Sequence, residues 1–124
     1  MEKVLCVDDN LSILYLYQDE LSEEGYEVIL ATGGREALMK FEKDTPHLAV
    51  MDIRIPDTDV TEILTTMQIK NPGIPVILNT AYLHYPKNLM ALGAEACVFK
   101  SADLTELKRK IREALEKRRI SRRE

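Results

Sequence analysis

The chain has 124 residues, of which 45% are hydrophobic and 31% charged, and its formal net charge is −4. This length suits one domain with its own core and leaves no room for a second. No stretch approaches the length of a membrane span, and no basic region followed by a long apolar run opens the chain, so we expect a soluble cytoplasmic protein with no membrane partner.

Charge is distributed unevenly along the chain. Residues 1–107 carry 8 basic against 18 acidic side chains, whereas residues 108–124 carry 9 against 3. We expect a domain over residues 1–117 and a basic tail over residues 118–124. A solvated helix end is the leading interpretation of the basic segment; attraction to anionic surfaces and the start of a linker remain open. No nucleic-acid motif accompanies it, so nucleic acid is not an expected partner.

The first half of the chain alternates between apolar runs and helical spacing. Val4 to Val7 predicts a buried strand that ends in acids, and residues 11–24 predict a helix that Gly25 stops. Residues 26–30 predict a second strand, followed by a short helix with Ala37, Leu38 and Phe41 on its inner face. After Pro46, residues 47–51 predict a strand buried on both faces, with Asp52 at its carboxyl end.

The second half continues the alternation. A third helix is predicted from the spacing of Val60, Ile63, Leu64 and Met67, a fourth strand over residues 75–79, and a fourth helix within the less regular segment 81–93. Residues 96–99 predict the fifth strand, and the last helix starts near Asp103. Strands and helices alternating over short turns predict an α/β fold, a doubly wound five-stranded parallel sheet covered on both faces.

Two cysteines, Cys6 and Cys97, each lie in one of these apolar runs. A cysteine in such a run is usually a small buried hydrophobe. A reducing interior disfavours a disulfide, and no His or Cys neighbours stand at metal-ligand spacing, so we expect neither use.

Residues capable of ionic chemistry stand at the ends of four predicted strands: Asp8 and Asp9, Asp52, Thr80 and Lys100. Because the carboxyl ends of parallel strands meet at one edge of the sheet, these residues are expected to converge on one pocket. Three carboxylates in a cleft repel one another, so positive charge must lie among them. Lys100 supplies one such charge, and an oxygen-ligated Mg²⁺ would supply two more.

Such a pocket suits phosphoryl transfer to an aspartate. Asp52 is a plausible nucleophile toward phosphorus, and Lys100 with the metal would neutralise the incoming group. The Thr80 hydroxyl would hydrogen-bond one of its oxygens. The expected product is an aspartyl phosphate.

The whole pattern resembles the receiver domain of two-component response regulators, of the stand-alone single-domain type, over residues 3 to about 117. The matching positions are Asp8-Asp9, Asp52 with Pro56 four residues on, Thr80-Ala81 and Lys100, each at the end of a strand. The resemblance implies a flavodoxin-like sheet with strand order 2-1-3-4-5. It also implies signalling rather than the turnover of a metabolite.

The resemblance implies a role for each of these residues. Asp52 would accept a phosphoryl group from a histidine kinase or phosphotransfer protein. Asp8 and Asp9, with Asp52 and the backbone carbonyl of Arg54, would bind Mg²⁺. Thr80 and Lys100 would move onto the phosphoryl group and change the surface made by the fourth helix, fifth strand and fifth helix, where a downstream protein would bind.

Several positions depart from the family pattern. Cys97 stands where an aromatic ring is usual. Ser101 stands where a proline usually permits a cis peptide bond after the lysine, so either the bond between Lys100 and Ser101 is trans or the strain of a cis bond is tolerated there. Asp57 and Val60 stand where glycines are usual, which predicts a stiffer and more acidic loop. Arg54, together with Tyr82, would exclude water and give a long-lived phosphoryl form.

Other classes of protein share parts of this pattern. A haloacid-dehalogenase-like phosphohydrolase also uses an aspartate nucleophile, but it wants a second acid two positions later on its first strand, which Asp8-Asp9-Asn10 does not provide. A flavin carrier would need a hydroxyl-rich first loop. A receiver-like module that binds its partner without phosphorylation remains the closest alternative.

Overall fold

A five-stranded parallel sheet forms the centre of the structure, a computed structural model that describes residues 1–81 and 88–123. The strands lie in the order β2-β1-β3-β4-β5, which confirms the predicted fold class and strand order. Their bounds are Lys3–Val7 for β1, Glu27–Ala31 for β2, Leu48–Met51 for β3, Val76–Thr80 for β4 and Ala94–Phe99 for β5.

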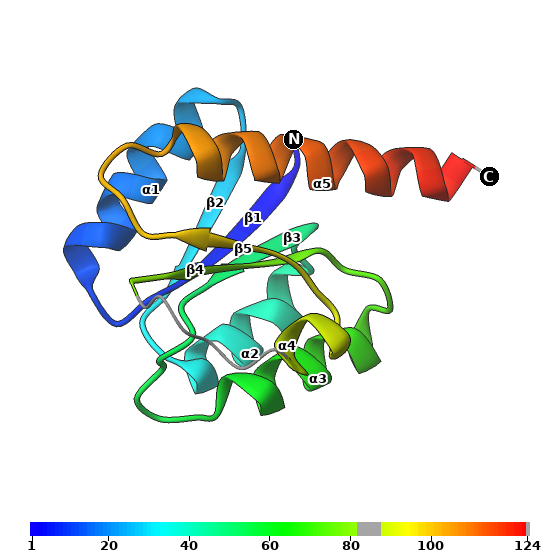
Figure 1. Cartoon of the computed structure of the whole chain (residues 1–124), viewed down its shortest axis with the longest axis horizontal. Coiled ribbons are helices and arrows are strands. Elements are labelled where there is room, and N and C mark those ends of the chain that lie inside the picture. Colours follow the sequence, from blue (N-terminus) through cyan, green and yellow to red (C-terminus); the bar gives the residue numbers. More distant parts are fainter. Residues whose placement is uncertain (82–87, 124) are drawn as a thin grey trace.

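Helices cover both faces of the sheet (Figure 1). The helices α1, Leu11–Glu23, and α5, Thr105–Arg123, pack on one face. The opposite face carries α2, Gly34–Asp44, α3, Val60–Lys70, and the short α4, Asn88–Ala91. This arrangement places the loops that leave the carboxyl ends of the strands along one edge.

The strands divide their side chains between two cores. In β1, Val4 and Cys6 face the helices α1 and α5, whereas Leu5 and Val7 face α2 and α3, as the alternation of a strand requires. Cys6 is fully buried, and this burial, with a smaller contribution from Asp8, raises the pKa of its thiol to about 12. Cys6 is therefore a core residue, as the sequence indicated.

Several element boundaries differ slightly from those predicted. The strand β5 begins at Ala94 and not at the predicted residue 96. Ala94 pairs with Val76 of β4, and the register shifts between Val76 and Ile77. Thr80 is the last residue of β4, paired with Phe99, rather than the residue after it. The fourth helix was expected within residues 81–93, and α4 occupies Asn88–Ala91 of that segment; residues 82–87, and hence Tyr82, lie outside the described residues.

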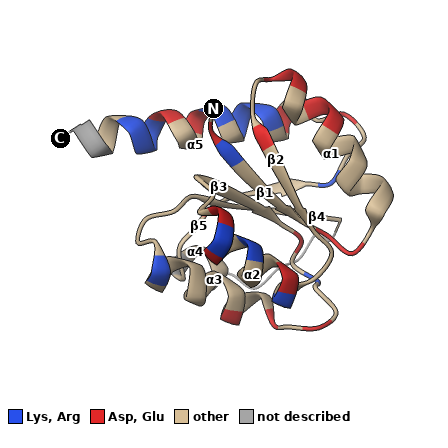
Figure 2. Ribbon diagram, turned by 180° about the vertical axis from the view of Figure 1, so that it is seen from behind, with Lys and Arg blue, Asp and Glu red and all other residues tan. Residues whose placement is uncertain are grey.

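The helix α5 carries the basic end of the chain. It runs on through position 117 to Arg123, and its last turns extend past the sheet (Figure 1). Basic residues, blue in Figure 2, recur along this helix. Arg118 nevertheless donates a hydrogen bond from Nη2 to Asn71 Oδ1 at 2.9 Å, and Arg119 is ion-paired with Glu2.

In the part of the chain that the structure describes, no helix combines the length and the apolar composition needed to cross a bilayer.

Candidate functional site

Two buried acids follow neighbouring strands at the carboxyl edge of the sheet. Asp8 follows β1 and Asp52 follows β3, and these residues are only 2% and 7% exposed. The backbone ladder continues past the strand ends to hold them: Asp8 N donates to Ala31 O and Asp52 N donates to Val7 O, each at 3.1 Å. The sheet therefore fixes the backbone that carries these two carboxylates.

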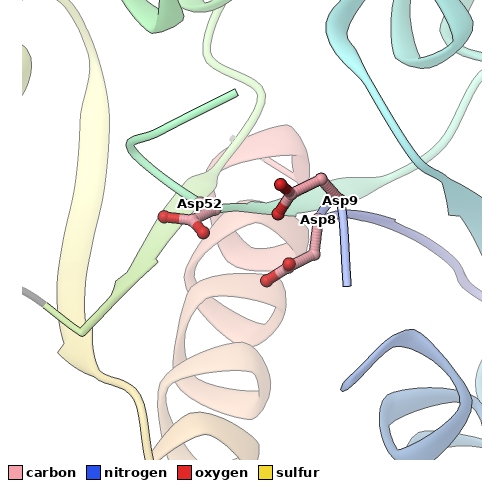
Figure 3. A group of neighbouring side chains, drawn as sticks. All are labelled: Asp8, Asp9 and Asp52. Carbon is pink, nitrogen blue, oxygen red and sulfur yellow. The ribbon is translucent and has the colours of Figure 1, made fainter. Parts of the chain in front are cut away.

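Asp9 completes a group of three carboxylates (Figure 3). One oxygen each from Asp8, Asp9 and Asp52 lies within 4.8 Å of the other two. Asp9 is exposed, so the group opens to solvent on that side. Oxygen donors this close together fit a hard cation such as Mg²⁺, which prefers carboxylates and retains several waters.

Lys100, directly after β5, lies between the two buried acids. Its Nζ is 2.6 Å from Asp8 Oδ2 and 2.8 Å from Asp52 Oδ2. Burial by itself lowers the pKa of this ammonium group, but its hydrogen bonds with Asp52 and Asp8 outweigh burial and raise the pKa above the ordinary 10.5. Lys100 is therefore charged at neutral pH and offsets part of the repulsion among the acids.

The second oxygen of each buried acid accepts a backbone hydrogen bond. Asp8 Oδ1 accepts from Asn10 N at 2.9 Å, and Asp52 Oδ1 accepts from Arg54 N at 3.2 Å. Asn10 also caps α1, since its side chain accepts from Ser12 N and Ile13 N. Each carboxylate is thus held between a backbone N–H group and the Lys100 ammonium group.

An open pocket of about 580 Å³ adjoins this cluster. Asp9, Asp52, residues 53–56 and residues 58–60 line it. Arg54 is among these lining residues. Thr80 is 2% exposed at the end of β4, and its carbonyl accepts a hydrogen bond from Lys100 N at 2.6 Å. The structure thus brings the predicted site residues to one edge of the sheet.

Two further polar contacts near this edge were not predicted. Tyr17 of α1 accepts a hydrogen bond at its hydroxyl from Asn79 of β4, and both residues are 3% exposed. Burial, followed by the charge of Asp8, raises the pKa of Tyr17 well above its usual range. An asparagine inside an otherwise apolar strand was the available signal.

The other unpredicted contact joins the loop after Asp52 to α2. Asp57 Oδ1 accepts from Gly34 N at 2.7 Å, and Asp57 Oδ2 accepts from Arg35 N at 3.2 Å. The paired glycines Gly33 and Gly34, with no side chain of their own to cap a helix, were the signal for a cap from elsewhere.

The loop after β5 settles one open question. The described residues contain no cis peptide bond, so Lys100 and Ser101 are joined by a trans bond. Cys97, in the position where an aromatic ring was expected from the resemblance, is half-buried on β5.

Comparison with known proteins gives a family match over most of the chain. Residues 4–112 match the response regulator receiver domain family. Sporulation initiation phosphotransferase F of Bacillus subtilis (strain 168) is 34% identical over 116 residues, which are 92% of this chain and 94% of that protein. The probable transcriptional regulator ycf27 of Pyropia yezoensis is 36% identical over 116 residues, 92% of this chain, but the chain spans only 47% of that relative's length.

Solved structures agree with the sequence match. The response regulator TrrA of Thermotoga maritima, in complex with Mg²⁺-BeF, has 38% identity and a TM-score of 0.84, covering 92% of this chain and 99% of that one. TrrA in complex with the histidine kinase ThkA has 37% identity and a TM-score of 0.82, covering 93% of this chain and 99% of that one. The chain therefore belongs to the receiver domains of response regulators, the phosphoacceptor modules of two-component signalling.

Proposed function

We propose that Asp52 is the residue that accepts the phosphoryl group, and that the donor is the phosphohistidine of a histidine kinase or phosphotransfer protein. The observation that carries this proposal is the position of Asp52, beside Lys100 Nζ at 2.8 Å and in a cluster with Asp8 and Asp9. A relative of this chain, TrrA, has been solved with a histidine kinase. Family membership also favours a receiver over the haloacid-dehalogenase-like hydrolase.

The chemistry is a single phosphoryl transfer. A carboxylate oxygen of Asp52 attacks phosphorus, the bond from phosphorus to the donor imidazole nitrogen breaks, and that nitrogen keeps the electron pair. Lys100 is already placed to offset the negative charge of the transferred group. The Thr80 hydroxyl is proposed to donate a hydrogen bond to one of its oxygens.

We propose that Asp8, Asp9, Asp52 and the backbone carbonyl of Arg54 hold Mg²⁺. When bound, the ion would draw negative charge away from the transferring oxygens. Support comes from the three carboxylate oxygens within 4.8 Å of one another, and from the solved complex of TrrA with Mg²⁺-BeF.

We propose that the output is a change of binding partner at the face made by α4, β5 and α5. Phe99 of β5 and Met90 of α4 are exposed there, at 55% and 43%. Phosphorylation would shift the population between two arrangements of this face. Because Cys97 lacks the bulk of a ring, the shift is expected to depend on Thr80 and Lys100.

Incubation with phosphoramidate and Mg²⁺, followed by intact mass, tests the proposal. We expect wild-type protein to gain one phosphoryl group, about 80 Da, and Asp52→Asn or chelation of the metal to abolish the gain. Asp19→Asn, which removes an exposed acid of α1, is the matched control and should be labelled like wild type.

The same spectra give two further results. Followed over time after removal of the donor, they measure the lifetime of the phosphoryl form, which we expect to exceed seconds because Arg54 lies in the pocket lining. Labelling of Asp52→Asn at the wild-type level, or repeated hydrolysis of a small phosphate ester without a stable adduct, would contradict the proposed function.

A further inference from the structure

The loop from Ile53 to Asp59 forms a wall of the pocket beside Asp52. Residues 53–56 and 58–60 contribute to the lining of this pocket. Asp57, in the middle of the loop, directs its carboxylate toward the start of α2 (Figure 1 shows these two segments side by side). The pocket wall is therefore attached to a second element of the fold.

The attachment is a helix cap supplied from a distant part of the chain. Gly33, the N-cap residue of α2, makes no side-chain capping bond. The free N–H groups of Gly34 and Arg35 donate instead to the two oxygens of Asp57, at 2.7 Å and 3.2 Å. A carboxylate suits this position because the first N–H groups of a helix lack partners within it and its N-terminus is the positive end of its dipole.

The ionisation of Asp57 agrees with this role. The hydrogen bond from Gly34 N, and then that from Arg35 N, lower the pKa of its carboxyl group below the ordinary 3.8. The side chain is therefore charged throughout the neutral range, and the contact does not depend on protonation there.

The start of α2 and the loop that contains Asp57 and Thr58 are in close contact. A Cβ at Gly34 would lie 2.6 Å from both Thr58 Oγ1 and Ile63 Cδ1, and a Cβ at Gly33 would lie 3.0 Å from Asp57 Oδ1. The loop thus packs directly on the start of α2 at Asp57 and at Thr58. Such close packing predicts one preferred position of the loop.

We propose that Asp57 is a positioning residue for phosphoryl transfer: by binding α2, it holds the loop that places Arg54 next to Asp52. Arg54 is three residues before Asp57, and its N–H group donates to Asp52 Oδ1 at 3.2 Å. At the far end of the loop, Asp59 caps α3 by accepting from Thr61 N at 2.8 Å. Between these ends, Asp57 ties the loop to another part of the fold.

This inference rests on the proposed function, because it concerns the same pocket. A site whose ligands are held in place before the cation arrives binds it more tightly than one that must be ordered first. Releasing the loop should therefore weaken Mg²⁺ binding and slow labelling at limiting Mg²⁺. At saturating Mg²⁺ most of the labelling rate should return.

The experiment compares Asp57→Ala and Asp57→Asn with Glu36→Ala and Glu36→Gln. Glu36 is a matched control because it lies in the first turn of α2, which Asp57 caps, and because its replacement removes the same charge. Its carboxylate bonds to Thr32 N at 3.1 Å and to Lys40 instead of the pocket loop. Calorimetric titration with MgCl₂ measures the metal affinity. Amide hydrogen exchange at Gly34 and Arg35, in protein without Mg²⁺, reports on the contact itself.

We expect Asp57→Ala to raise the Kd for Mg²⁺ by about tenfold, the low end for the loss of a residue that supports a metal ligand, and to speed amide exchange at Gly34 and Arg35. Asp57→Asn should give a smaller effect, because its amide oxygen can still accept from Gly34 N. The Glu36 variants should keep the wild-type Kd. An unchanged Kd in both folded Asp57 variants, or an equal rise in the Glu36 variants, would overturn the proposal.

Labelling of the wild type separates this inference from the proposed function. Wild-type protein that takes no phosphoryl group on Asp52 contradicts the proposed function, and the inference falls with it. Wild-type protein that is labelled, together with Asp57 variants that bind Mg²⁺ as tightly, contradicts the inference alone.

Discussion

The ammonium group of Lys100 lies between two buried carboxylates, 2.6 Å from Asp8 and 2.8 Å from Asp52. The sequence predicted that these residues would meet, because each stands at the end of a strand in a parallel sheet. It could not predict that one lysine would contact both acids at once. That detail depends on side-chain rotamers, which strand positions do not determine.

Replacement of Lys100 by Met should lower the free energy of unfolding by about 1–3 kcal/mol at neutral pH, because Asp8 and Asp52 lose their shared partner. Lys108→Met is the control: Lys108 makes an ion pair with Glu20 at 3.2 Å nearer the surface, and its loss should cost less than about 1 kcal/mol. Urea unfolding of the three proteins, followed by circular dichroism, measures both differences. Equal effects of the two substitutions would contradict this account.

The pH dependence of the Lys100 effect follows from its raised pKa. The folded state binds the proton more tightly than the unfolded state, so the stabilisation is fully present below the ordinary pKa of 10.5 and is lost as the pH rises through the higher folded value. The difference between wild type and Lys100→Met should therefore stay constant at neutral pH and shrink as the solution becomes alkaline.

The contact of Asp57 with α2 could not be predicted from the positions of residues at strand ends. From sequence it was one acid in an acidic loop, and nothing in a local pattern joins it to a helix that begins 23 residues earlier. Long-range side-chain contacts of this kind require the folded backbone. The same limit applies to Asn79, whose partner Tyr17 is 62 positions away.

Between elements, the contact of Tyr17 with Asn79 joins α1 to β4 inside the core on the α1 and α5 side. Asn79 directly precedes Thr80, and both are buried. A buried amide needs a partner, since an unsatisfied one costs roughly 1–3 kcal/mol. The pair therefore fixes α1 against the strand that carries a proposed phosphoryl contact.

Tyr17→Phe should lower the free energy of unfolding by about 1–3 kcal/mol, because it leaves the Asn79 amide buried without this partner. Tyr15→Phe removes an equivalent hydroxyl from a side chain that is 55% exposed on the same helix, and should change stability by less than about 0.5 kcal/mol. Adding Asn79→Leu to Tyr17→Phe should recover part of the loss. A Tyr17→Phe variant as stable as Tyr15→Phe would contradict the interpretation.

The strand β3 was predicted well because it is buried on both faces. All of β3 is buried, so its apolar run marks the element within a residue. The strand β5 was placed to begin two residues late, because Ala94 and the exposed Glu95 interrupt the apolar pattern at its start. Pairing with β4 decides that boundary, and pairing is a tertiary property.

At the scale of the molecule, the first and last segments of the chain meet at the amino-terminal edge of the sheet. Arg119 of α5 is ion-paired with Glu2. Beside this pair, Lys3 N donates to Nδ1 of His47, the residue directly before β3, at 2.9 Å. The expected domain over residues 1–117 would leave out the Arg119 contact and the bond from Arg118 to Asn71. Leu115, the last residue of α5 that is buried among those up to position 121, would remain.

A chain that ends at Lys117 should therefore fold and be labelled on Asp52 like the full chain. Its free energy of unfolding should fall by about 0.5–1.5 kcal/mol, because the hydrogen bond from Arg118 to Asn71 is lost; the exposed ion pairs of Arg119 with Glu2 and with Glu116 are lost as well. Asn71→Ala in the full chain removes only the first of these and should lose less. A truncated chain that does not fold would show that the domain includes the basic segment.

Because Lys100 pairs with both Asp8 and Asp52, any other cation in this pocket competes with it for the same carboxylates. A dication bound by Asp8 and Asp52 would compete with Lys100 for their carboxylate oxygens, so metal binding is expected to weaken the pairing of this lysine. If either Asp8 or Asp52 lost its negative charge, the Lys100 ammonium group would pair with the other acid alone. The backbone N–H group of Lys100 also donates to Thr80 O at 2.6 Å, so the residue that carries this ammonium group joins the ends of the last two strands of the sheet.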